Sequence, residues 1–156
     1  MKQLLNLRNA LMVLTVAIAF CACSSGKKIP SQNLATDPDS PITETYWKLT
    51  ELMGKPVTTA AEMKKEMHLI LKTEGSRVQG NGGCNGFMGS YTPLAGNRLS
   101  FSPMAGTKMA CSNMELENQF MEILSRVDNY AIKGKVLSLN KARMAPLARF
   151  EAVLMK

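Results

Sequence analysis

The chain has 156 residues, which is room for one domain once a targeting segment is set aside. Its 19 basic and 12 acidic residues give a formal net charge of +7, spread along the chain rather than gathered in one run. Because this charge is moderate and no base-stacking motif accompanies it, the composition argues against nucleic-acid binding, and we expect no nucleic-acid partner.

The N-terminus predicts a lipoprotein signal peptide over residues 1–22. Lys2 and Arg8 come before an uncharged apolar run that is too short to cross a membrane as a helix. Ala22 directly before Cys23 fits lipoprotein processing, which makes Cys23 the lipidated first residue of the mature chain. The alternative is an ordinary signal peptide cut near Ala22, and that cut would leave Cys23 as an unpaired thiol in an oxidising compartment.

Residues 23–43 are predicted to be the lipidated cysteine followed by a flexible tether. This stretch is rich in Ser, Pro, Asp and Lys and offers almost nothing to bury. A flexible chain of this length has a root-mean-square reach on the order of 25 Å. Removal of the leader, which contains two basic residues and no acidic ones, lowers the formal charge from +7 to +5.

The globular part, residues 44–156, is dominated by strand patterns. Alternation places Trp47 and Leu49 on one face of the first strand. Gly96 and Asn97 suit the positive φ of a hairpin turn. Between the first two strands, residues 58–65 have no clear pattern and are expected to be weakly helical or irregular. The segments with strand patterns are residues 45–52, 67–73, 77–80, 87–94, 98–103, 129–134, 135–140 and 147–155.

One segment, residues 112–127, has helical periodicity. Ser112 followed by Glu115 predicts a capping box at its start. The apolar stripe consists of Leu116, Phe120, Ile123, Leu124 and Val127. The polar residues expected to face elsewhere are Glu115, Glu117, Asn118, Glu122 and Arg126. The predicted fold class is therefore α+β: a curved antiparallel sheet or partly closed barrel of six to eight strands with one amphipathic helix packed on it.

The glycine-rich stretch "NGGCNGFMGSY", residues 81–91, could be a phosphate cradle, a metal site or a reactive thiol. A phosphate-binding P-loop needs Gly-Lys-Ser/Thr leading into a helix, and neither is present here. His68 is the only histidine, and Cys84 and Cys111 are the only cysteines of the globular part, with no metal-ligand spacing. Cys84 also lacks an evident general base. We therefore expect no enzymatic activity, no metal and no cofactor.

The remaining interpretation of the two cysteines is that they pair with each other. Disulfides persist in the compartment to which an exported chain is sent. A bridge from Cys84 to Cys111 would tie the glycine-rich stretch to the residue just before the helix cap. The alternative is two buried thiols without a bridge.

These motifs in this order resemble the META domain of HslJ-type bacterial lipoproteins over residues 44–156. The departure from the family pattern is Gly86, where the family often has a larger polar or basic residue. The motifs are "YWKL" at 46–49, "GKPV" at 54–57, "GGCNGFMGSY" at 82–91, "TKMAC" at 107–111, a helix with Glu117 and Phe120, and "LSL" at 137–139. The residues that match, which we interpret as structural, are Cys84, Asn85, Gly89, Tyr91, Thr107, Met109 and Cys111.

The resemblance implies a non-enzymatic lipoprotein of the bacterial cell envelope, with acyl chains such as palmitate on Cys23 and the outer membrane as its location. It links the chain loosely to envelope stress, drug tolerance or secretion. The expected partners are the membrane, through the lipid, and an envelope protein, a lipid or a small apolar molecule. The alternatives are a thiol enzyme or redox carrier that uses Cys84, and an assembly or pilot factor for envelope proteins.

Overall fold

A computed structural model of the chain describes residues 38–58, 65–111 and 114–153. The predicted signal peptide, Cys23, most of the tether and most of the 58–65 segment lie outside these residues. The strands are β1 (Tyr46–Leu52), β2 (Lys55–Pro56), β3 (His68–Lys72), β4 (Arg77–Asn81), β5 (Gly86–Leu94), β6 (Arg98–Phe101), β7 (Ala105–Gly106), β8 (Asn129–Lys133), β9 (Val136–Asn140) and β10 (Ala148–Val153). The helices are the 3-10 turn η1 (Glu74–Ser76) and α2 (Glu115–Arg126).

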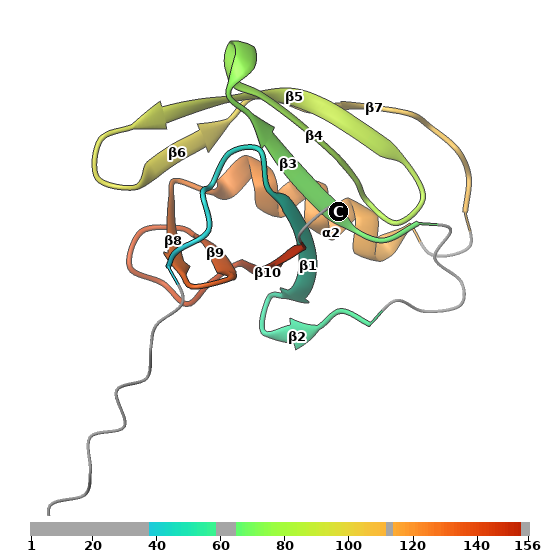
Figure 1. Ribbon diagram of the computed structural model, residues 1–156. Coiled ribbons are helices and arrows are strands. Elements are labelled where there is room, and N and C mark those ends of the chain that lie inside the picture. The colour runs from blue at the N-terminus through green and yellow to red at the C-terminus, as the bar shows by residue number, and fades with distance from the viewer. Residues whose placement is uncertain (1–37, 59–64, 112–113, 154–156) are drawn as a thin grey trace, which may run out of the picture. The chain divides into compact units, whose positions relative to one another are not determined.

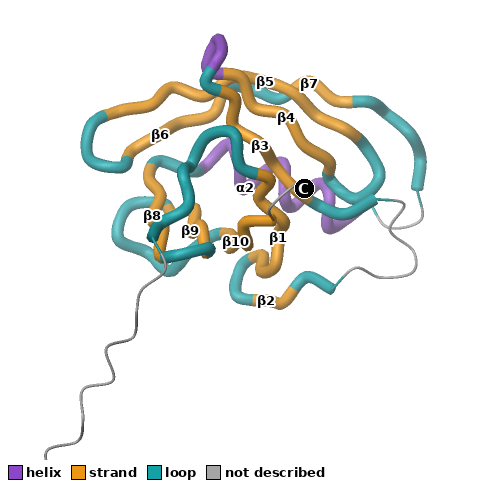
Figure 2. The backbone as a smooth tube through the Cα atoms, viewed as in Figure 1, coloured by secondary structure: helices purple, strands orange, loops and turns teal. Residues whose placement is uncertain are grey.

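Eight strands form a closed antiparallel barrel, which confirms the predicted fold class (Figures 1 and 2). The strand order is β10–β9–β8–β6–β5–β4–β3–β1, and pairing of β1 with β10 closes the ring. The short strands β2 and β7 pair with β1 and β5 outside this ring. Closure satisfies the backbone hydrogen bonds that an open sheet would leave at its edges.

Two contacts between neighbouring strands of the barrel, which we call seams, differ in how many residue pairs they contain. Strands β1 and β10 share a register that runs from Tyr46↔Val153 to Leu52↔Ala148. Strands β6 and β8, by contrast, are paired only at Arg98↔Asn129. Helix α2 packs Phe120 into the core and connects β7 to β8. The sparse seam between β6 and β8 therefore lies where the chain leaves α2 and enters β8.

Large apolar side chains fill the space inside the barrel. Trp47 and Leu49 are buried on one face of β1, as the alternation predicts, and the Trp47 indole N–H donates to the carbonyl of Ile42 at 2.9 Å. Phe120 of α2 lies between Phe87 and Phe150, with ring centroids 5.7 and 6.0 Å away. Each fully buried side chain of this size contributes about 1.5–3 kcal/mol to the free energy of unfolding. The core therefore holds helix and barrel together.

The predicted hairpins are confirmed. Strands β3 and β4 pair through η1, and β5 and β6 pair through a turn in which Gly96 and Asn97 have φ values of 74° and 57°. Strands β8 and β9 pair around Gly134. The helix begins at Glu115 after Met114, without a side-chain cap, and Ser112 of the predicted capping box lies outside the described residues.

The domain begins earlier than the predicted boundary at residue 44. Asp39 Oδ1 accepts a hydrogen bond from the Gly134 N–H at 2.7 Å, and the Ser40 N–H donates to the Gly134 carbonyl at 2.9 Å. Ile42 packs against the core. Residues 39–43 therefore belong to the domain rather than to the tether. Within the part of the chain that is described, no helix is both long enough and apolar enough to traverse a bilayer.

Candidate functional site

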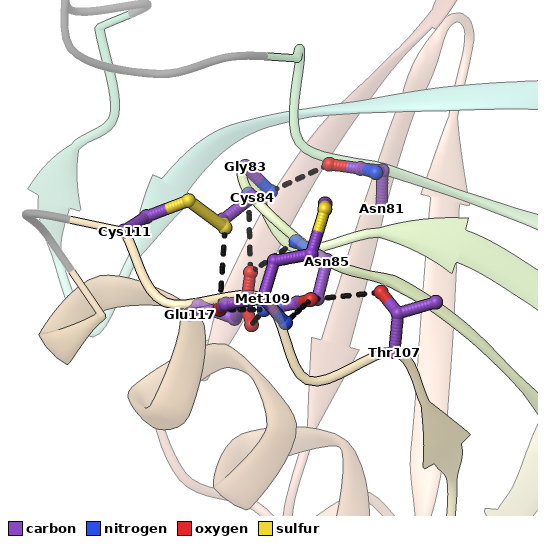
Figure 3. The surroundings of a disulfide bond; sticks show 8 residues. All are labelled: Asn81, Gly83, Cys84, Asn85, Thr107, Met109, Cys111 and Glu117. Carbon is purple, nitrogen blue, oxygen red and sulfur yellow. Dashed lines mark hydrogen bonds between the residues drawn. A yellow bond between two sulfur atoms is a disulfide. The ribbon is translucent and has the colours of Figure 1, made fainter.

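The glycine-rich stretch forms the connection between β4 and β5, and a disulfide joins it to the segment before α2 (Figure 3). The bridge is the expected one, from Cys84 to Cys111, with an S–S distance of 1.98 Å. Gly83 has a φ of 104°, which a residue with a Cβ rarely adopts. Its N–H donates to Asn81 Oδ1 at 2.8 Å, a local turn bond of the kind that Asn favours. The stretch is thus a bent connection rather than a phosphate cradle.

The side-chain amide of Asn85 lies at the centre of a hydrogen-bond network. Its Oδ1 accepts from the Thr107 hydroxyl and from the Met109 N–H, both at 2.7 Å. Its Nδ2 donates to the Met109 carbonyl at 3.1 Å and to Glu117 Oε1 at 2.8 Å. Both donor hydrogens and two acceptor positions of the amide are therefore used. Asn85 holds three chain segments at once.

Glu117 comes from the first turn of α2 and is only 6% exposed. Its Oε2 accepts from the Cys84 N–H at 3.1 Å and from the Asn85 N–H at 2.8 Å (Figure 3). A Cβ at Gly82 would lie 2.6 Å from Glu117 Cγ, so glycine at that position makes room for the carboxylate. Hydrogen bonds to a charged acceptor are stronger than those between neutral groups. Glu117 therefore fixes the loop to the helix.

The sequence prediction for Glu117 was wrong, because we placed it on the polar side of the helix. Glu117 precedes Phe120 by three residues and Leu124 by seven, which puts all three on one face. That spacing was visible in the sequence, but the charge of the side chain decided the assignment. Buried charges are rare, and they are accepted when every oxygen finds donors, as here.

The other motif residues do not join this network. Gly89 lies further along β5, where a Cβ would meet Met104 Sδ at 2.6 Å. The Tyr91 hydroxyl donates to the Lys72 carbonyl at 3.3 Å, and burial, followed by the charge of Glu44, raises the pKa of the phenol. Both residues therefore serve packing of β5 rather than a shared site.

Among the residues that the structure describes, none forms a catalytic arrangement with the two cysteines. Cys84 is buried and its sulfur is bonded to Cys111. His68, the single imidazole, stacks on Tyr46 with ring centroids 4.3 Å apart, and its Nδ1 lies 3.0 Å from the Glu66 carbonyl. Among the residues with defined positions, no group of three or more His, Cys, Asp or Glu is placed to hold a metal ion.

An exposed apolar surface, which was not predicted from the sequence, lies on the outside of β4, β5 and β7. Met88, at 67% exposed, is the most exposed of the large apolar side chains described. It lines two neighbouring pockets of about 420 and 430 Å³, and the second of these is also lined by the polar side chains of Lys72, Arg77 and Gln79. The available signal was its position next to the buried Phe87 on an alternating strand. We define the Met88 surface as Met88 with its small neighbours Gly80, Gly86, Gly89, Ala105 and Gly106.

Comparison with known proteins agrees with the resemblance found in the sequence. The family model of the META domain matches residues 40–153, which includes the early residues 40–43. An NMR structure of a protein from Burkholderia xenovorans is similar in fold, with a TM-score of 0.59 and 24% identity, over 78% of this chain and 93% of that chain. A second NMR structure has a TM-score of 0.52 and 24% identity, over 69% and 87% of the two chains. Among curated proteins, none matches the chain.

Proposed function

The chain belongs to the META domain family, and we propose that it is a non-enzymatic lipoprotein of the bacterial cell envelope that binds a protein partner through the Met88 surface. In this proposal the signal peptide is removed, Cys23 is lipidated, and the acyl chains hold the domain at the outer membrane. Two or three acyl chains suffice for stable anchoring without a spanning helix.

One observation favours a protein partner over a small apolar ligand. The space inside the barrel is occupied by Trp47, Phe120 and Phe150, each 0% exposed, whereas ligand-binding barrels keep an interior cavity. Among the large apolar side chains that the structure describes, the most exposed is Met88, on the outside of the barrel. Exposed apolar patches of this kind typically mark sites of association. Methionine suits such a surface because its flexible thioether adapts to the partner.

The disulfide and Glu117 support this proposal by fixing the surface. Gly86 and Thr107, which line one pocket beside Met88, are held by the strand pairing that follows the bridged loop, and the Thr107 hydroxyl is bonded to Asn85. A rigid surface loses less conformational entropy when it binds. The thiol enzyme or redox carrier is the second candidate, and it requires that the disulfide be opened during function.

Site-specific photo-crosslinking in intact cells tests the partner. A photoreactive residue is placed at position 88 or, as a control, at Met53, another methionine that is 51% exposed. We expect one discrete crosslinked protein from position 88, its loss with Gly106→Lys in the same chain, and no such product from position 53. Equal products from both positions, or none from position 88, would refute the Met88 surface as the binding site.

Separate experiments test the anchor and the physiological role. Metabolic labelling with a fatty acid should mark the wild-type chain and leave Cys23→Ser unlabelled. We further propose that the role lies in envelope stress or drug tolerance. Deletion of the gene should then sensitise cells to membrane-active compounds, and Met88→Lys should fail to restore tolerance although the protein accumulates normally.

A further inference from the structure

A third pocket, of about 680 Å³, lies at the sparse seam between β6 and β8. Its lining includes Arg98 from β6, Asn129 and Tyr130 from β8, and Arg143 from the loop that follows β9. The Tyr130 N–H donates to the Asn97 carbonyl at 2.9 Å, so backbone bonds hold the two sides of the seam together. The pocket is therefore part of the folded barrel wall rather than a gap between loose loops.

Positive charge dominates this pocket. Arg98 and Arg143 form no ion pair with the carboxylates that the structure describes, and Lys141 is close in sequence to Arg143. The one acidic residue of the lining is Asp128, which accepts from the Ala142 N–H at 2.8 Å and from Asn129 Nδ2 at 2.6 Å. Asp128 thus holds the loop that carries Arg143 through its hydrogen bond to Ala142.

The charge state of Asp128 leaves the pocket cationic. The hydrogen bond from the Ala142 N–H, followed by the one from Asn129, lowers the pKa of Asp128, and Arg98 and Lys141 lower it further. One carboxylate therefore stands among three cationic side chains at neutral pH. Arginine binds phosphate well because its planar guanidinium donates two parallel hydrogen bonds.

Exposed apolar side chains flank the pocket on two sides. Leu94, at 50% exposed, is paired with Arg98 across the β5–β6 hairpin. Met144, at 61% exposed, directly follows Arg143 in a turn closed by its N–H to the Lys141 carbonyl at 3.1 Å. A cationic site with apolar side chains beside it is the combination that interfacial membrane-binding surfaces use.

We propose that this face docks on an anionic phospholipid surface, with a lipid phosphate group between Arg98 and Arg143 and with Leu94 and Met144 inserted at the interface. The inference rests on the proposed anchor, which brings the domain to the membrane.

Docking in this orientation leaves the Met88 surface available. Met88 and Leu94 are six residues apart on β5, which at about 3.3 Å per residue separates them by roughly 20 Å. A partner could therefore bind at Met88 while Leu94 contacts lipid. The membrane would then set the direction in which the domain presents its protein-binding surface.

Fluorescence quenching in vesicles tests the docking with the whole lipidated protein. A cysteine that carries a fluorophore replaces Met144 or, as a matched control, Met88, and the bridged native cysteines remain unlabelled. The vesicles contain either phosphatidylglycerol or phosphatidylcholine, with a quencher confined to the bilayer. We expect strong quenching at position 144 only in phosphatidylglycerol vesicles, and weak quenching at position 88 in both.

The double variant Arg98→Gln with Arg143→Gln should weaken docking about 30-fold, since each basic residue near an anionic surface contributes roughly fivefold, about 1 kcal/mol. Quenching should also fall at 1 M salt, where the Debye length is about 3 Å. Equal quenching at positions 144 and 88, or quenching at 144 that survives the double variant, would overturn the inference. Failure of the anchor is distinguishable, because unlipidated protein would carry no acyl mass and would not co-sediment with phosphatidylcholine vesicles.

Discussion

Glu117→Gln is the substitution that most sharply tests the structural role of the buried carboxylate. Glutamine can keep an oxygen toward the Cys84 and Asn85 N–H groups. Its NH₂ group then takes the place of Glu117 Oε1, which in the structure lies 2.8 Å from Asn85 Nδ2. One hydrogen bond to a charged acceptor is lost and two donors face each other. We expect the free energy of unfolding to fall by about 1.5–3 kcal/mol.

Urea unfolding of the oxidised protein measures this change through the fluorescence of Trp47, the single tryptophan, which is fully buried. The matched control is Glu122→Gln on the same helix, where the side chain is 68% exposed and pairs with Arg126. The control should cost only about 0.3–0.5 kcal/mol. A Glu117→Gln protein that unfolds within 0.5 kcal/mol of the wild type would refute the argument that this carboxylate fixes the loop to the helix.

Three further outcomes concern the disulfide, Gly82 and Asp128. Cys84→Ser combined with Cys111→Ser opens a loop whose ends are 27 residues apart, and calorimetry should show a loss of about 3.6 kcal/mol on the chain-entropy model. Gly82→Ala should also destabilise the protein in urea, since its Cβ would meet Glu117 Cγ at 2.6 Å; wild-type stability would show that the site relaxes freely. The lowered pKa of Asp128 means that its stabilisation is present above the ordinary value of 3.8 and is lost as the pH falls through the lower folded value. Asp128→Asn should therefore be less stable than wild type at pH 7, and urea titrations at pH 2 should show the difference closing; a constant difference would contradict this.

Local patterns predicted the strands and hairpins well. Trp47 and Leu49 on β1 follow a period of two, and Gly96 and Asn97 have the positive φ that their turn requires. Barrel closure was predicted only as one of two possibilities, because β1 and β10 pair across about a hundred residues and no local pattern encodes that contact. The start of the domain was also misplaced, since the short polar segment near Asp39 is fixed by distant contacts rather than by its own composition.

The candidate site was predicted in part. The cysteine pair was expected from the compartment and the cysteine count, and Asn85 and Thr107 were identified from the family resemblance. Glu117 was predicted to face solvent because charged side chains are rarely buried, although its spacing from Phe120 and Leu124 places it on the buried face of the helix. The exposure of Met88 was indicated by the alternation along its strand, whereas its neighbours Gly80, Ala105 and Gly106 come from the paired strands β4 and β7. The pocket at Arg98 could not be predicted, because it combines β6, β8 and the loop after β9, which only the closed barrel brings together.

Native mass spectrometry of the protein extracted from cell envelopes tests the proposal of a lipid-anchored domain with a filled interior most directly. The predicted mass begins at Cys23, includes the acyl chains, lies two hydrogens below the reduced form, and carries no small molecule in addition. A chain without acyl mass would contradict the anchor. A stoichiometric apolar molecule that dissociates only on unfolding would contradict the filled barrel and, with it, the assignment of binding to the outer surface.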